Sequence, residues 1–188
     1  MRIFATALAA LGLSAGLMAP VHPAEAVQVR LLDGVLHLAV PADIPEEDIG
    51  LNQSDTALGI LDGRMFADTD RRIGVAVLER KVAPAQAGET PADLSRAAQA
   101  YMADQRGTVS GLRTVANEAF TVGGLPLHRL EWVGAVMDLP SRVTVFFARA
   151  HGRQAEVQVY TGYRDEAGHR ALVARIQASL RATVPAMP

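Results

Sequence analysis

The sequence predicts an α+β fold, in which an antiparallel β-sheet is packed by helices. Several segments alternate apolar and polar residues with a period of two, as half-buried strands do. Two other segments repeat apolar residues at helical spacing and carry the end signals of helices. Strands come first along the chain, followed by a helix, a run of further strands and a last helix, an order typical of α+β proteins. Hydrophobic residues make up 49% and charged residues 20% of the chain, which is a globular composition.

The first strands are expected to form a hairpin. Residues 27–32 and 35–40 alternate and flank Asp33-Gly34, a pair typical of a type I′ turn. A second Asp-Gly pair, at 62–63, indicates another turn. Residues 73–80 carry apolar side chains on both faces, so we expect a central strand that is covered twice.

The first helix should begin at residues 90–93, whose sequence is Thr-Pro-Ala-Asp. These residues provide a capping hydroxyl, a proline at the first helical position and a carboxylate three residues after the cap. Apolar residues then recur at helical spacing from Leu94 to Met102, and we expect Gly107 to close the helix.

The second half of the chain predicts an antiparallel meander. Its expected strands span residues 111–120, 127–137, 142–150 and 154–163. Residues 138–141 and 151–153 are expected to form turns. In the second of these strands Trp132 should point into the core, whereas Arg129 and Glu131 should point outward.

The last helix is expected to begin near Asp165. Its apolar stripe spans residues 172–180, and arginines in its later turns favour the helix dipole. Pro185 should end it.

Residues 1–26 have the three-part layout of a secretory signal peptide. Arg2 supplies a positive start, an uncharged and mostly apolar run follows as far as Met18, and Ala-Glu-Ala at 24–26 is a small-residue cleavage site. We expect cleavage after this site, which leaves residues 27–188 as a single α+β domain in the periplasm or outside the cell. An uncleaved N-terminal anchor is the alternative, although the apolar run is shorter than the roughly 20 residues that span a bilayer.

Composition and motifs exclude several classes of function. A net charge of −2 provides no basic footprint for nucleic acid. Because the chain has no cysteine, it has no disulfide, thiolate metal site, cysteine nucleophile or lipid anchor on cysteine. Nucleotide-binding glycine motifs are absent, and the nearest approach to a nucleophile elbow, at residues 107–111, has the wrong spacing. We therefore expect no cofactor, no metal and no enzymatic activity.

Two alternatives to a non-catalytic protein stay open. A small secreted hydrolase would need a deep pocket in which at least two of a small set of groups meet. The candidate groups are His128, His151, His169, Asp68 and Glu131. A small-molecule binding protein would hold an apolar ligand between helix and sheet.

Charged residues are the candidates for a surface that faces a partner. One group belongs to an acidic loop at residues 41–55 and consists of Asp43, Glu46, Glu47 and Asp48. The other group contains arginines at positions expected to point outward, and consists of Arg142, Arg149, Arg153 and Arg164. Residues 68–72 (Asp-Thr-Asp-Arg-Arg) predict a charged turn, with a further partner-facing patch as the alternative. Charges of this kind steer association more than they fix affinity.

The sequence Val-Gly-Gly-Leu-Pro-Leu-His-Arg-Leu at residues 122–130 resembles the DcrB-related and PsbP-like group of small α/β/α sandwich proteins. With the order of elements, the resemblance covers residues 35–183. It implies an accessory or binding role and carries no shared catalytic residues. The DcrB type is commonly a lipoprotein, and this chain departs from that type because it lacks cysteine. We therefore expect an exported, non-catalytic accessory or adaptor protein that docks a protein partner or an envelope component.

Overall fold

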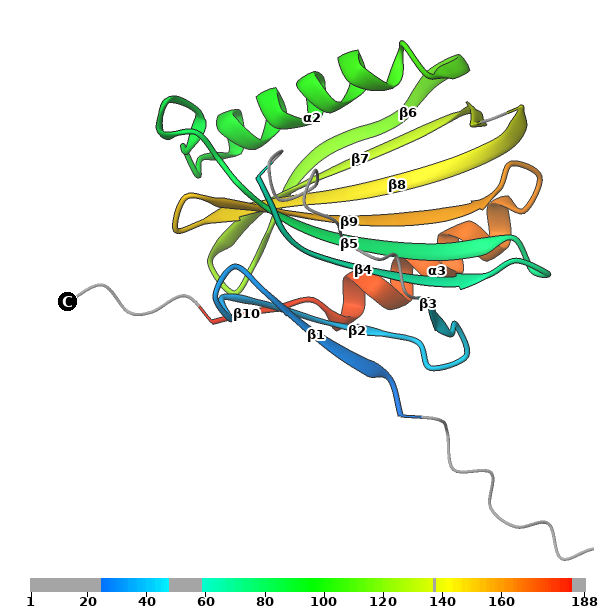
Figure 1. Cartoon of the computed structure of the whole chain (residues 1–188), viewed down its shortest axis with the longest axis horizontal. Coiled ribbons are helices and arrows are strands. Elements are labelled where there is room, and N and C mark those ends of the chain that lie inside the picture. The colour runs from blue at the N-terminus through cyan, green and yellow to red at the C-terminus, as the bar shows by residue number, and fades with distance from the viewer. Residues whose placement is uncertain (1–24, 48–58, 137, 184–188) are drawn as a thin grey trace, which may run out of the picture.

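The described part of the chain folds into two antiparallel sheets, two α-helices and a short 3-10 helix (Figure 1). The computed structural model describes residues 25–47, 59–136 and 138–183. The large sheet has the strand order β3-β4-β5-β9-β8-β7-β6, and the small sheet has the order β1-β2-β10. The strands of the large sheet are β3 (Glu46–Glu47), β4 (Ile60–Asp68), β5 (Ile73–Lys81), β6 (Val109–Val122), β7 (Leu125–Val136), β8 (Leu139–Ala150) and β9 (Arg153–Gly162). The other elements are β1 (Val27–Leu31), β2 (Leu36–Val40), β10 (Arg181–Ala182), the short 3-10 helix η1 (Pro84–Gln86), α2 (Pro91–Gln105) and α3 (Glu166–Ser179).

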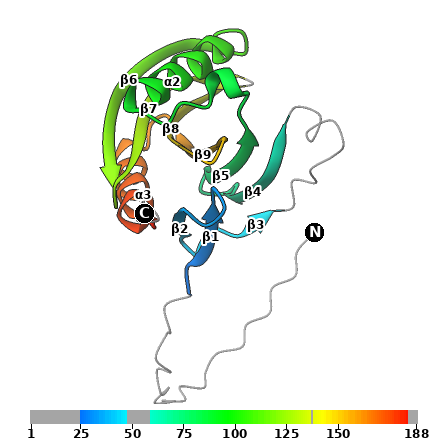
Figure 2. The same ribbon diagram turned by 90° about the vertical axis from the view of Figure 1, so that its left-hand side faces the viewer.

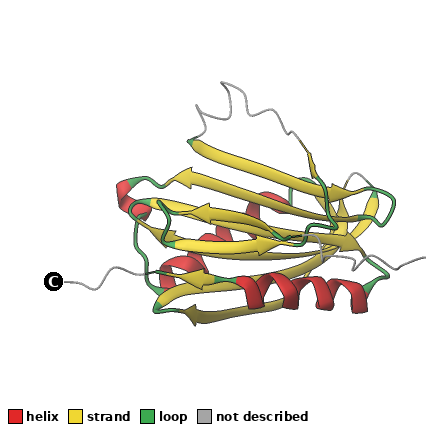
Figure 3. Cartoon of the chain, turned by 90° about the horizontal axis from the view of Figure 1, so that it is seen from below, coloured by secondary structure: helices red, strands yellow, loops and turns green. Residues whose placement is uncertain are grey.

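These elements stack in three layers (Figures 1 and 2). Helix α2 packs on one face of the large sheet, against β6, β7 and β8. Helix α3 and the small sheet cover the other face, where α3 contacts β2, β8 and β9. Figure 3 shows α3 running in roughly the same direction as the strands. The predicted α+β fold is confirmed, and β6 to β9 form the expected meander.

Each boundary between layers has its own apolar core. The core beneath α2 includes Trp132, which is fully buried as expected. The core beneath α3 and the small sheet is larger and includes Phe66, Phe146 and Ile176. Full burial of a large apolar side chain contributes about 1.5–3 kcal/mol, so these two cores are the main source of stability.

Helix α2 begins with the predicted capping box. The Thr90 hydroxyl accepts the backbone N–H of Asp93 at 3.3 Å, and the Asp93 carboxylate accepts the backbone N–H of Thr90 at 3.0 Å. Pro91 occupies the first helical position, where no intrahelical donor is needed. The sequence therefore determines this helix start locally.

The β1–β2 hairpin turns through three consecutive residues with positive φ: Leu32 (57°), Asp33 (55°) and Gly34 (83°). Asp33 and Gly34 have the φ signs of the expected type I′ turn, which is closed by a 3.1 Å hydrogen bond from the Val35 N–H to the Leu32 carbonyl. A leucine in the left-handed region costs about 1–2 kcal/mol. Burial of Leu32 offsets this cost, and its N–H donates to the Glu79 carboxylate at 2.7 Å, which ties the hairpin to β5.

The turn between β6 and β7 lies against the last strand. Gly123 has a φ of 52°, and a Cβ added there would lie 2.6 Å from the Ala182 carbonyl oxygen of β10. Only glycine allows the turn to approach β10 this closely. This glycine of the 122–130 pattern therefore has a packing role.

Four local predictions differ from the structure. Glu46–Glu47 form β3 within the expected acidic loop, because they pair with the outer edge of β4. The Asp-Gly pair at 62–63 makes no turn and lies within β4, beside an irregularity in its pairing with β5. β8 begins at Leu139, which pairs with Val136, so the turn before it is shorter than expected. α3 ends at Ser179, and the chain then pairs with the edge of β2 as β10.

Candidate functional site

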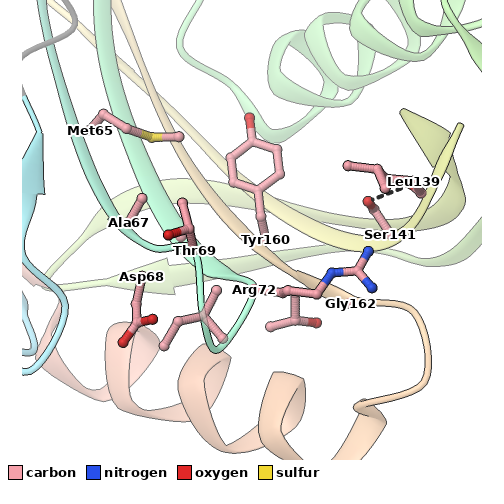
Figure 4. A pocket seen from close by; sticks show the side chains of 12 residues that line it. Met65, Ala67, Asp68, Thr69, Arg72, Leu139, Ser141, Tyr160 and Gly162 are labelled. Carbon is pink, nitrogen blue, oxygen red and sulfur yellow. Dashed lines mark hydrogen bonds between the residues drawn. The ribbon is translucent and has the colours of Figure 1, made fainter. Parts of the chain in front are cut away.

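One end of the large sheet carries a cavity of about 460 Å³, here called the strand-end pocket (Figure 4). Its walls come from the β4–β5 hairpin, the start of β8 and the end of β9. Its lining includes Met65, Ala67, Arg72, Gly74, Leu139 and Tyr160. The volume lies within the range of about 300–1,000 Å³ that small-molecule sites occupy.

The strand-end pocket forms because the small residues Ala67 and Gly74 leave space on β4 and β5, which α2 does not cover. Helix α2 makes its main contacts with β6, β7 and β8 and not with β4 or β5. Ala67 of β4 pairs with Gly74 of β5, and Gly74 pairs with Tyr160 of β9. Met65 and the ring of Tyr160 lie beside the space that these small residues leave (Figure 4).

The two arginines of the β4–β5 turn have different surroundings. The Arg71 guanidinium forms ion pairs with Asp68 at 2.6 Å and with Asp43 at 2.9 Å. The backbone N–H and guanidinium of Arg71 hold the pKa of Asp68 below its usual value, and the guanidinium does the same for Asp43. Arg72 has no ion pair within the described residues, and its guanidinium carbon lies 4.0 Å from where a Gly162 Cβ would be. The pocket therefore has a positive charge that Asp68, already paired, does not offset.

A second hollow of about 410 Å³ adjoins the strand-end pocket and shares Arg72 and Gly162 with it. Its lining adds Tyr163 and Arg164 from the β9–α3 connection. Arg164 is exposed and has no ion pair in the described ranges. Asp165, also in the lining, accepts the Gly168 N–H at 2.9 Å and caps α3. We call this region, with exposed Leu139, Tyr163, Arg72 and Arg164, the cationic rim.

The cationic rim also carries exposed apolar side chains and non-glycine residues with positive φ. Within the described residues, four large apolar side chains are exposed, and two of them are Leu139 (56%) and Tyr163 (44%). Arg72 and Asp138 have positive φ values of 54° and 63°. A non-glycine residue in the left-handed backbone conformation costs free energy, and such residues gather at functional sites. The rim therefore differs from an ordinary solvated end of a sheet.

Two of the four acidic residues predicted to face a partner are engaged within the chain. Asp43 forms ion pairs with Arg71 at 2.9 Å and with Arg175 at 3.3 Å. Glu46 forms a 2.7 Å ion pair with Arg64. Glu47 is exposed and has no ion pair among the described residues. Asp48 lies outside the described residues.

Two of the four predicted arginines do not point outward. Arg142 and Arg149 are only 9% and 8% exposed, because β8 is an inner strand covered on both faces. Arg142 binds the buried Glu131 at 2.7 Å, so the outward placement expected for Glu131 is also wrong. Arg149 donates to the Gln154 side chain at 2.8 Å. The inference from strand alternation failed because both faces of β8 are interior.

The side chains of the other two arginines, Arg153 and Arg164, are at least partly exposed to solvent. Arg153 bridges Glu79 at 2.7 Å and Asp33 at 2.9 Å, which links the small sheet to the large one. Arg164 belongs to the cationic rim, as described above.

The groups that a hydrolase would need lie apart. His128 is buried on β7 and contacts Asn117, whereas His151 is exposed in the β8–β9 turn. His169 is buried on α3 between two threonine hydroxyls. Glu131 lies on the same side of the sheet as His169, but both of its oxygens are bound by arginines and both residues are buried. Asp68 lines the strand-end pocket, and none of the other four groups does.

The described ranges hold neither a metal-ligand cluster nor a long apolar helix. No group of three or more histidine or carboxylate side chains there could hold a metal ion. Across residues 25–47, 59–136 and 138–183, none of the helices has both the length and the apolarity to cross a membrane.

The sequence pointed to only part of this site. Residues 68–72, for which the sequence predicts a charged turn with a partner-facing patch as the alternative, supply Arg72. The pocket residues Met65, Leu139 and Tyr160 were missed, since they belong to three strands that only the sheet order brings together. The signal available was the small size of Ala67 and Gly74, which face each other on strands where larger residues are usual.

Comparison with known proteins shows a PsbP-like fold. No family model matches the sequence, and no curated protein matches it either. The structure is similar to CyanoP, the cyanobacterial PsbP of Synechocystis sp. PCC 6803, with a TM-score of 0.60 and 15% identity over 90% of this chain and 99% of that chain. It is also similar to LpqN of Mycobacterium tuberculosis, a protein involved in cell envelope biogenesis, with a TM-score of 0.53 and 14% identity over 84% of this chain and 90% of that chain. The expected resemblance is thus confirmed at the level of the fold.

Proposed function

We propose that this protein is an exported accessory protein without a catalytic centre, which docks a protein partner through the cationic rim. The observation that carries the proposal is the coincidence of exposed apolar side chains with arginines that have no counter-ion in the described part of the chain. Leu139 and Tyr163 lie beside Arg72 and Arg164 at the same end of the sheet. Exposed apolar groups with a polar edge mark interaction surfaces, and aromatic and arginine side chains are enriched in them.

The chemistry of the rim indicates what the partner must present. Arginine side chains recognise carboxylates, so the partner surface should be acidic. Leu139 and Tyr163 need an apolar contact that removes them from water. The opposite charges would speed association, and burial of the two apolar side chains would set the lifetime of the complex.

The fold supports an accessory role by resemblance. PsbP-like domains are compact layers of sheet and helix, and LpqN is described as involved in cell envelope biogenesis. Fold likeness does not determine activity, so the proposal rests on the rim.

Site-specific photo-crosslinking tests the docking surface. A photoreactive phenylalanine analogue at position 163 should give a discrete crosslinked product in the envelope fraction of the source cell. The matched control places the same analogue at Val115, which is 42% exposed on β6. The product from position 163 should weaken on addition of salt, because exposed charges are screened. Absence of a discrete product, or the same product from position 115, would contradict the docking surface.

Export is tested separately. We propose that residues 1–26 are a signal peptide removed after Ala26, and that residues 27–188 form a single domain in the periplasm or outside the cell. Cell fractionation should recover the protein outside the cytoplasm, and intact-mass measurement should place its N-terminus at Val27. A chain that keeps Met1 and sediments with membranes would instead indicate an uncleaved anchor.

A further inference from the structure

We propose that the strand-end pocket binds a small aromatic carboxylate. The ligand's ring would lie among the apolar walls, and its carboxylate would bind Arg72. This site shares Arg72 and Leu139 with the cationic rim, but it extends over the β4–β5–β9 face and does not require Tyr163 or Arg164, so the two proposals can be tested apart.

The charge of the ligand follows from the arginines of the turn. Arg71 is already occupied by two carboxylates, of which Asp68 is the one that lines the pocket. Arg72 has no such partner among the described residues. A planar guanidinium binds a carboxylate through two parallel hydrogen bonds, which an amine or a neutral amide cannot reproduce. The ligand should therefore be an anion.

The shape of the ligand follows from the walls. Met65, Leu139 and the ring of Tyr160 supply apolar and aromatic surface, and Ala67 and Gly74 keep the floor open. Thioether and aromatic side chains favour contact with a flat aromatic ring. The Tyr160 hydroxyl donates to the Gln158 side chain, so the tyrosine offers its ring to the pocket. Simple inorganic anions would leave these walls unused.

The proposal is tested by measuring the binding of 3-phenylpropanoate to residues 27–188 with calorimetry and NMR. We expect saturable binding at one site, with shifts at residues of β4, β5 and β9. The neutral amide 3-phenylpropanamide lacks the carboxylate, and inorganic phosphate lacks the aromatic ring. Each should therefore bind at least about ten-fold more weakly. Binding of phosphate alone with equal affinity would reduce the site to a surface anion contact and overturn the proposal.

Paired variants locate the site. Arg72→Gln should weaken 3-phenylpropanoate binding by about ten-fold or more, whereas Arg113→Gln on exposed β6 should not. Ala67→Leu should abolish binding by filling the cavity, whereas Ala119→Leu on β6 should leave it intact. Circular dichroism and amide NMR spectra verify that each variant is folded. Equal effects within either pair, or no saturable binding by the wild-type chain, would overturn the proposal.

The outcomes also separate the two proposals. Ala67→Leu should leave the crosslink from position 163 unchanged, and Tyr163→Ser should leave 3-phenylpropanoate binding unchanged. In the wild-type chain, absence of either 3-phenylpropanoate binding or the crosslink, with the other present, therefore identifies which proposal has failed.

Discussion

Acidification from pH 7.5 to pH 5 should destabilise the protein through His169. This side chain has 0% exposure, and both ring nitrogens contact threonine hydroxyls, Nε2 with Thr144 at 2.8 Å and Nδ1 with Thr161 at 3.0 Å. Burial lowers the pKa of His169 from 6.5 to about 4; the negative charge of Glu131 opposes the shift, and the positive charge of Arg142 adds to it. The folded state therefore holds this imidazole neutral.

The size of the effect follows from proton binding. Between the unfolded pKa of 6.5 and the folded value of about 4, the unfolded chain binds a proton that the native chain excludes. Unfolding free energy then rises with pH by about 1.4 kcal/mol per unit. The contribution of His169 is complete above pH 6.5, falls by about 2 kcal/mol by pH 5, and is lost once the pH passes below the folded pKa. The pKa of His128 is also lowered by burial, so its effect has the same sign.

A variant isolates the His169 contribution. His169→Gln keeps a side chain that can hydrogen-bond the two threonines and carries no charge at any pH. Urea unfolding followed by circular dichroism, at four pH values from 7.5 to 5.0, should show a wild-type loss about 2 kcal/mol larger than the loss in the variant. The control His151→Asn replaces an exposed histidine in a turn and should keep the wild-type pH dependence.

Equal pH dependence in the wild type and His169→Gln would refute this reasoning. A direct measurement guards against a variant that folds poorly. In NMR spectra of the wild type, the imidazole signals of His169 should not titrate between pH 7.5 and pH 5. A midpoint above pH 6 would show that burial does not hold the ring neutral.

Two further predictions concern the fold. Gly123→Ala should destabilise the protein by about 1–3 kcal/mol more than Gly152→Ala in thermal unfolding, because both positions have positive φ but only a Cβ at Gly123 meets the Ala182 carbonyl; equal losses would remove the packing role of this turn. Thr90→Ala should cost about 1 kcal/mol in urea unfolding through loss of the α2 cap, and Thr90→Ser should restore most of it; a neutral Thr90→Ala would show that Pro91 alone is sufficient to start the helix.

The elements predicted best are those whose signals are local. The capping box at Thr90 depends on residues within four positions of one another, and so does the turn at Asp33-Gly34. The inward position of Trp132 follows from strand alternation beside a strongly apolar face. Predictions that depended on a neighbouring strand were less accurate, since the edges that receive β3 and β10 come from distant parts of the chain.

The candidate site was only partly predictable for the same reason. Arg72 lies in a recognisable charged turn, but its lack of a counter-ion depends on Arg71 taking both Asp43 and Asp68. Arg142 looked like a surface residue, because alternation gives the side of a strand and does not show whether that side is covered.

The amino-acid sequence by itself determined the class of fold, the helix starts, the first hairpin and the absence of cysteine chemistry. These properties depend on composition and on residues close together in the chain, where backbone geometry and capping act directly. Tertiary structure alone decided which polar residues are buried, where α2 ends its cover of the sheet, and that Ala67, Gly74 and Tyr160 leave a hollow beside Arg72. Packing between layers brings together residues that lie far apart in sequence, and no local pattern encodes that proximity.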